Sequence, residues 1–201
     1  MSSHGHSHGG EACHGHGAPE APPVYPFEGA SSAMSALLGP VLFSKAAAEG
    51  PEEPFGEAAT DAALAGADFV MVYCSAHWCP PCRAFTPELT AWVNKHGARL
   101  RLKLVFASSD RDEAAFSGYF KGMAAGALAL PFGDDKADEL MRKFKVSGIP
   151  TLLVLDASGH LLTKQGREGV SSDAEGAHFP WAGAGAAGAD ESGGGGGCTV
   201  A

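Results

Sequence analysis

The middle of the chain alternates long apolar runs with segments of helical periodicity. Phe69–Cys74 is apolar and aromatic throughout, and Leu100–Ala107 becomes equally apolar after an initial alternation of leucine with basic residues. Uninterrupted runs of this kind are typical of strands that are buried on both faces of a sheet. Two shorter runs, Thr151–Leu155 and His160–Lys164, flank the turn sequence Asp-Ala-Ser-Gly and predict an antiparallel hairpin.

Helical spacing fills the segments between these strands. The side chains of Phe85, Leu89 and Trp92 recur at three- to four-residue intervals and predict a helix over Pro80–His96, with Gly97 as its stop. Strands that alternate with helices and end in a hairpin predict an α/β fold, in which helices cover both faces of a central sheet. The remaining elements are expected to be a short strand at Val41–Ser44 and helices over Glu57–Ala65, Asp112–Phe120 and Asp134–Phe144.

Composition changes sharply at both ends of this region. Residues 1–33 are rich in histidine and glycine and then in proline, with too few large apolar residues to offset the entropy of ordering, so they are expected to be disordered. Residues 182–201 alternate glycine with alanine and then run through consecutive glycines, which is typical of a flexible tail. The folded domain is therefore expected over residues 34–181.

Charge and apolar content exclude several classes of protein. The net charge of −9 divides into −7 for residues 1–67, zero for 68–181 and −2 for 182–201. No segment carries a basic stripe, so we expect no nucleic-acid partner. The chain also lacks an apolar run long enough to span a membrane and a recognisable secretory leader. With five cysteines, this pattern indicates a reducing compartment, the cytoplasm, rather than a disulfide scaffold.

Cys79-Pro80-Pro81-Cys82 is the motif that carries candidate chemistry. It follows a buried strand and opens the predicted helix, where unpaired N–H groups and the helix dipole stabilise a thiolate. Both prolines suit the first helical turn and stiffen it. We therefore expect Cys79 to be the attacking thiolate and Cys82, one turn deeper, to resolve the mixed disulfide.

Other residues around this motif have a structural and a functional interpretation. A Cys-x-x-Cys pair also serves as half of a zinc site, but the domain offers no second ligand pair, with Cys74 expected in the core and His77 on the surface. Trp78 is expected to cover the active site. Ile149-Pro150 opens a strand and is a candidate cis peptide, where Ile149 and Pro150 would lie beside Cys79 and bind an incoming peptide.

Together these residues resemble the thioredoxin superfamily, and within it the tryparedoxin and nucleoredoxin branch. The resemblance rests on Tyr73–Arg83, Phe85–Leu89, Ser147–Leu152 and Phe179–Trp181, and it extends over about residues 36–181. It implies a thioredoxin-like fold with a central mixed sheet flanked by helices. It also implies thiol–disulfide exchange with protein partners.

Two departures from known family patterns bear on mechanism and docking. Thioredoxins carry a buried acid six residues before the nucleophile, whereas this chain has Tyr73 there, as the branch does. The residue that manages the proton of the resolving cysteine is therefore not the usual one. The branch also usually has the segment Met-Pro-Trp-Leu-Ala-Val-Pro, whereas Met123–Pro131 is two residues longer and lacks the tryptophan. This change alters a candidate docking surface.

Both tails contain further candidate sites. A flexible cluster of imidazoles and a thiol could bind a transition metal weakly, although biased composition alone also explains it; its members are His4, His6, His8, Cys13, His14 and His16. The final residues, Cys198-Thr-Val-Ala, fit a prenylation pattern. A single prenyl chain gives only marginal membrane residence, so we expect partial, peripheral association through Cys198.

The sequence thus predicts a monomeric oxidoreductase that reduces protein disulfides and needs no cofactor beyond its own dithiol. Its partners would be disulfide-containing proteins and an upstream dithiol donor. The alternative is a redox-sensitive adaptor of the nucleoredoxin type, which binds a signalling partner according to the oxidation state of Cys79 and Cys82.

Overall fold

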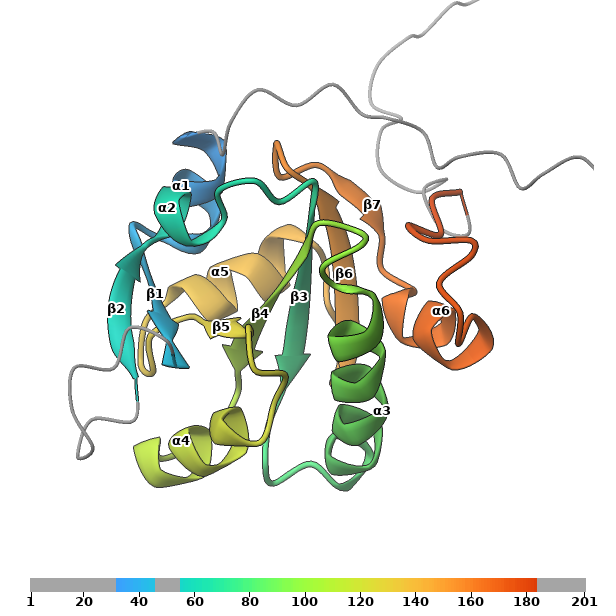
Figure 1. The fold of residues 1–201 in the computed structure, drawn as a ribbon. Coiled ribbons are helices and arrows are strands. Elements are labelled where there is room, and N and C mark those ends of the chain that lie inside the picture. The colour runs from blue at the N-terminus through green and yellow to red at the C-terminus, as the bar shows by residue number, and fades with distance from the viewer. Residues whose placement is uncertain (1–31, 46–54, 184–201) are drawn as a thin grey trace, which may run out of the picture.

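One mixed seven-stranded sheet organises the molecule, in the strand order β2-β1-β5-β4-β3-β6-β7 (Figure 1). The computed structural model describes residues 32–45 and 55–183. Its strands are β1 (Val41–Ser44), β2 (Gly56–Ala59), β3 (Phe69–Ser75), β4 (Leu102–Ser108), β5 (Leu128–Ala129), β6 (Thr151–Asp156) and β7 (Leu161–Thr163). Its helices are α1 (Ser32–Leu38), α2 (Thr60–Ala63), α3 (Pro80–His96), α4 (Glu113–Lys121), α5 (Lys136–Lys143) and α6 (Gly166–Ser172).

β3 forms the centre of the sheet, and all seven of its residues are buried. It pairs in parallel with β4 and antiparallel with β6, so that Val72 lies opposite both Val105 and Leu153. A strand with neighbours on both edges and helices on both faces needs apolar residues at every position, which explains the uninterrupted run at Phe69–Cys74. The expected mixed sheet flanked by helices is confirmed.

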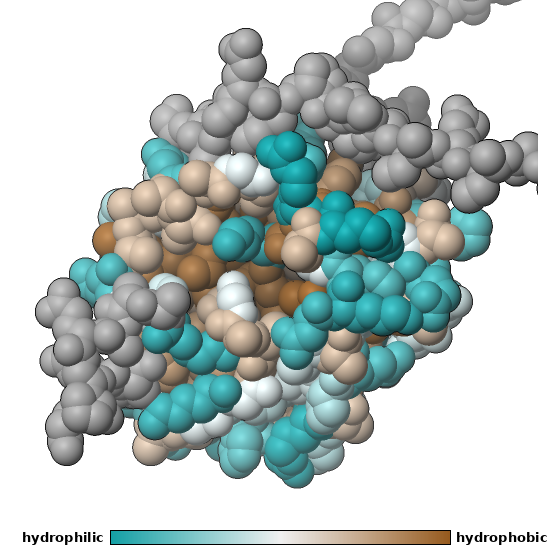
Figure 2. Space-filling model, viewed as in Figure 1, coloured by the Kyte–Doolittle hydropathy of each residue, from teal (hydrophilic) through white to brown (hydrophobic). Residues whose placement is uncertain are grey.

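The helices form two layers, one on each face of the sheet. Alternate residues of β3 serve the two layers, because successive side chains of a strand point to opposite faces. Met71 and Tyr73 pack with α3, α4 and α6, whereas Val70 and Val72 pack with α1 and α5. In the space-filling view, apolar residues gather near the centre and upper left of the visible face, and hydrophilic residues lie mainly to the right and below (Figure 2).

Several elements differ from the sequence-based expectation. The segment expected to be helical over Glu57–Ala65 instead forms β2 and then the short α2, because Gly56–Ala59 pairs with β1. Helix α1 begins at Ser32, inside the stretch expected to be disordered. β5 and α6 were not expected at all. Residues 1–31 and 184–201 lie outside the described residues, and with them the five histidines and the cysteine of the metal candidate cluster and Cys198.

The segment Asp173–Trp181 folds back against α3, and we call it the C-terminal hook. The Asp173 carboxylate accepts hydrogen bonds from the backbone N–H groups of Ala177 and His178, at 2.9 and 2.8 Å, and from Trp181 Nε1 at 3.0 Å. Trp92 Nε1 of α3 donates to the Asp173 carbonyl at 2.8 Å. Trp92 is buried, and the centroid of the Trp181 ring lies 5.3 Å from that of Trp92.

No helix in the described part of the chain is long and apolar enough to cross a bilayer.

Helix α3 ends at His96, directly before Gly97, as predicted. Gly97 itself keeps right-handed helical angles, and the left-handed residue that follows the helix is Arg101, with a φ of 49°. A side chain at Gly97 would meet the Val93 carbonyl oxygen at 2.7 Å, so close backbone approach explains this glycine.

Candidate active site

The cysteine pair lies where β3 gives way to α3, at the lower end of the molecule in Figure 1. Cys79 is the N-cap residue of α3, and its Sγ accepts a hydrogen bond from the Cys82 N–H at 3.3 Å. The two cysteines form a disulfide with their Cα atoms 5.2 Å apart. Pro80 and Pro81 occupy the first helical positions, where a missing N–H removes no hydrogen bond.

Exposure differs slightly between the two sulfur-bearing residues. Cys79 retains 4% of its accessible surface, whereas Cys82 retains none. A helix N-terminus presents unpaired N–H groups and partial positive charge, which favour a thiolate on a reduced Cys79. The arrangement is therefore suited to thiol–disulfide exchange.

The loop before β6 forms the second wall of the site. The Ile149–Pro150 peptide bond is cis, as the sequence predicts. The Ile149 carbonyl oxygen lies 3.9 Å from Cys79 Sγ, so Ile149 is beside the sulfur that the sequence assigns as nucleophile. Ile149 and Pro150 are both partly exposed.

Trp78 stands out at the rim of the site with 48% of its surface exposed. Its indole Nε1 donates to the Ser109 carbonyl at 2.9 Å, and the Arg111 guanidinium lies 5.3 Å from the ring centroid. Both partners come from the loop between β4 and α4. This loop therefore holds an exposed aromatic surface in a defined orientation beside Cys79.

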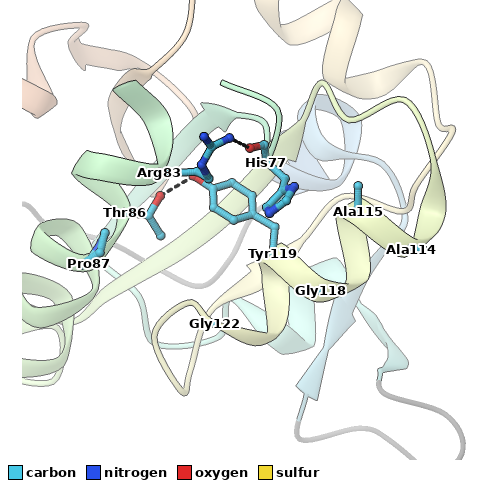
Figure 3. Close-up of a pocket in the computed structure, with 9 residues that line it drawn as sticks. All are labelled: His77, Arg83, Thr86, Pro87, Ala114, Ala115, Gly118, Tyr119 and Gly122. Carbon is cyan, nitrogen blue, oxygen red and sulfur yellow. Dashed lines mark hydrogen bonds between the residues drawn. The ribbon is translucent and has the colours of Figure 1, made fainter. Parts of the chain in front are cut away.

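The same loop also fixes the backbone at His77. The Asp110 carboxylate accepts a hydrogen bond from the His77 N–H at 2.7 Å, and Ser108 Oγ donates to its other oxygen at 2.9 Å. From the opposite side, an Arg83 guanidinium N–H donates to the His77 carbonyl at 2.6 Å. His77 is exposed, and its ring packs against Tyr119 of α4 (Figure 3).

Behind the cysteines, the position of the usual buried acid is filled by Tyr73. Its hydroxyl lies 2.9 Å from Thr86 Oγ1 and 3.3 Å from the Cys82 carbonyl oxygen. Burial raises the pKa of Tyr73 well above its ordinary value, so the phenol stays protonated. Burial likewise raises the pKa of Cys74 to about 12, which makes this thiol an inert member of the core, as expected.

Nothing in residues 32–45 and 55–183 groups three or more metal-ligating side chains. The sequence identified the cysteine pair, its prolines, Trp78 and the cis-proline loop, but it missed Asp110, Thr86 and Tyr119. The sequence did contain an indication of Thr86, because a residue four positions after Cys82 lies on the same face of the predicted helix. The sequence contained no such indication of Tyr119, since only the tertiary fold brings α4 beside α3.

Comparison with known proteins gives a consistent result. A family model described as thioredoxin-like matches residues 66–161. Nucleoredoxin from Danio rerio is 40% identical over 124 residues, which cover 61% of this chain but only 29% of that protein. Tryparedoxin from Trypanosoma brucei brucei is 41% identical over 114 residues, covering 56% of this chain and 78% of that one.

Solved structures show the same relationship. Tryparedoxin II from C. fasciculata superposes with a TM-score of 0.65 at 34% identity, covering 75% of this chain and 98% of that one. The fold and the dithiol at the start of α3 are those of the thioredoxin superfamily. Within it, the chain belongs to the branch of the tryparedoxins and nucleoredoxins.

Proposed function

We propose that the chain is a thiol–disulfide oxidoreductase that reduces disulfide bonds in partner proteins through Cys79 and Cys82. The observation that carries the proposal is the position of Cys79, which caps α3 beside the Ile149 carbonyl and the exposed ring of Trp78. A thiolate at this position is stabilised by the helix N-terminus, and the Trp78 ring beside it is exposed to a partner.

The exchange proceeds in two balanced steps. The Cys79 thiolate attacks one sulfur of the partner's disulfide, and the other partner sulfur leaves with the electron pair and takes a proton from water. Cys82 then loses its proton to solvent and attacks Cys79 Sγ. The Cys79–Cys82 bond forms, the second partner sulfur leaves as a thiolate, and the partner is reduced while this chain is oxidised.

An upstream dithiol must then reduce the Cys79–Cys82 disulfide to complete a cycle. A structure of tryparedoxin II, 37% identical to this chain with a TM-score of 0.60, is complexed with glutathionylspermidine, a low-molecular-weight thiol compound; the match covers 63% of this chain and 88% of that one. This supports a thiol of similar chemistry as the reductant here. No resident cofactor enters the proposed cycle.

Insulin reduction in the presence of a small dithiol tests the proposal. We expect the full chain to accelerate precipitation of the insulin B chain, because Cys79 opens the insulin disulfides faster than the free dithiol does. Cys79→Ser should give the rate of the dithiol alone, and Cys82→Ser should accumulate a mixed disulfide that is visible by mass. A wild-type chain that binds partners but never accelerates insulin reduction would favour the adaptor alternative instead.

A further inference from the structure

Four buried hydroxyl groups form a continuous network behind Cys82, and the exchange steps above make no use of them. Thr86 Oγ1 donates to the Cys82 carbonyl oxygen at 2.9 Å. Tyr119 OH lies 2.5 Å from Thr86 Oγ1, and Ser75 Oγ lies 3.1 Å from Tyr119 OH. Together with Tyr73, these residues come from β3, α3 and α4, and each is at most 8% exposed.

One assignment of the four hydroxyl protons satisfies four of the five contacts in this network. Ser75 donates to Tyr119, Tyr119 donates to Thr86, and Thr86 donates to the Cys82 carbonyl, while Tyr73 donates to Thr86 or to the same carbonyl. Hydrogen bonds that run in one direction polarise and strengthen one another. The network therefore directs its donors toward one backbone group, the carbonyl of the resolving cysteine.

The backbone next to Cys82 needs such support because Pro87 lies inside the helix. A proline inside a helix has no N–H for the carbonyl four residues earlier, which is that of Arg83, and its ring crowds the same carbonyl. The turn that carries Cys82 is thus held by fewer backbone hydrogen bonds than an ordinary helical turn. The hydroxyl network reinforces this turn at Cys82, the residue directly before Arg83, whose carbonyl has lost its helical partner.

We propose that Thr86, held in place by Tyr73 and Tyr119, is a positioning residue for the resolving step. It fixes the Cys82 carbonyl and so keeps the Cys82 thiol directed at Cys79 while a partner is attached. This inference rests on the proposed function. Cys79 Sγ lies against the Ile149 carbonyl oxygen and the Cys82 N–H and makes no hydrogen bond to any of the four hydroxyls, so we expect the first exchange step not to depend on them.

The positions of Thr86 and Tyr119 in the network predict which of the two hydroxyls contributes more to the resolving step. Thr86 and Tyr119 line a groove of about 410 Å³ between α3 and α4, with Gly118 and Pro87 on its walls (Figure 3). Thr86 donates to the Cys82 carbonyl directly, whereas Tyr119 reaches it only through Thr86. Tyr119→Phe should therefore weaken the resolving step less than Thr86→Val does.

The chain offers a matched control one helical turn away. Thr90 also carries a buried hydroxyl on α3, but this hydroxyl has no hydrogen-bond partner among the described residues. Thr90→Val thus makes the same chemical change as Thr86→Val without removing a contact. Thr86→Ser keeps the hydroxyl and serves as the rescue variant.

An aromatic disulfide, 5,5′-dithiobis(2-nitrobenzoate), separates the two steps in a single turnover. One equivalent is mixed with the reduced full chain carrying Cys13→Ser and Cys198→Ser in every variant, so that the dithiol alone reports. The first coloured thiolate appears when Cys79 attacks, and the second appears when Cys82 resolves the mixed disulfide. We expect Thr86→Val to slow the second release about fivefold to tenfold, the effect of one lost hydrogen bond, and to leave the first unchanged.

Thr90→Val should match the wild type in both phases, and Thr86→Ser should restore the second phase. The proposal is overturned if Thr86→Val slows both phases equally, if it slows neither, or if Thr90→Val has the same effect. A wild-type chain that releases no first thiolate would instead contradict the proposed function, so the two failures are distinguishable.

Discussion

At the scale of single residues, Cys74, Cys79 and Cys82 show how position sets the chemistry of one side chain. Cys74 lies in the central strand with its pKa raised by burial, whereas Cys79 caps a helix. Cys82 lies one turn further on and is fully buried. A thiol must ionise before it reacts, so the three environments predict three reactivities.

Alkylation of the reduced chain with iodoacetamide at pH 7 tests this order. Cys79 should be modified first and Cys82 later, while Cys74 should stay unmodified, because a pKa of about 12 leaves only about one thiol in 10⁵ ionised at this pH. Peptide mapping by mass gives the sequence of events. Modification of Cys74 in the native state, before denaturant is added, would contradict its inert role, and earlier modification of Cys82 would reverse the assigned roles.

The sequence predicts the residues whose chemistry is local to one segment. The Cys79–Cys82 spacing, the prolines between them and the strand-to-helix context lie within one stretch of chain, so their geometry follows from helix physics. Thr86, Tyr119 and Asp110 act through contacts with residues 13 to 44 positions away along the chain, and no short pattern encodes such contacts. Tyr73 is an intermediate case, since the sequence shows that it replaces the usual buried acid but does not show its hydrogen-bond partners, Thr86 and the Cys82 carbonyl.

At the scale of elements, tertiary pairing explains where the prediction fails. Glu57, Ala58 and Ala59 favour helix in isolation, but the segment pairs with β1 in register from Val41↔Ala59 to Ser44↔Gly56, and pairing outweighs propensity. β5 has only two residues, too few to show any period. Helix α6 contains Gly166 and Gly169, which weaken its helical signal. Gly169 is required because a Cβ there would overlap the Trp181 ring.

The C-terminal hook predicts a pH dependence of stability. Burial raises the pKa of Asp173, but hydrogen bonds from the His178 N–H, the Trp181 indole and the Ala177 N–H outweigh this and hold it below its ordinary value. A carboxyl with a lowered folded-state pKa stabilises the fold above the unfolded pKa of about 4, and this contribution disappears as the pH falls through the folded value.

Asp173→Asn should therefore lower the free energy of unfolding at pH 7 by about 1–2 kcal/mol, because it weakens charge-assisted hydrogen bonds. It should also reduce the loss of stability between pH 5 and pH 2 relative to the wild type. Urea unfolding at several pH values measures both quantities. If the free energies of unfolding of the two proteins fell in parallel across this pH range, the stability of the hook would not depend on the Asp173 charge.

At the scale of the whole molecule, the sheet separates two cores with different tasks. The face under α3, α4 and α6 carries the aromatic residues around Tyr73 and supports the cysteine pair. On the opposite face, α1 and α5 cover an aliphatic core that includes Leu38, Leu42 and Val72. The part of this second core around α1 lies far from the start of α3 (Figure 1), so it stabilises the fold without shaping the site.

Leu38→Ala separates stability from activity. Leu38 is fully buried, so its truncation should cost about 3 kcal/mol and lower the Tm by roughly 10 °C. Below that Tm, the rate of insulin reduction per folded molecule should equal that of the wild type. Ala36→Ser, at an exposed position of the same helix, is the control and should change neither quantity. A slower rate for the folded Leu38→Ala protein would show that the two cores are coupled.

The ends of the sheet also determine how this molecule can meet other chains. An unpaired strand edge is a template for adding a further strand, either from a partner peptide or from an aggregating neighbour. The described sheet ends in β2 and β7, which have four and three residues. Such short edges offer an incoming chain few main-chain hydrogen bonds. We therefore expect a partner in the proposed exchange to be recognised by the loops around Trp78 and Pro150 rather than by strand addition, and we expect the short sheet edges to favour little aggregation.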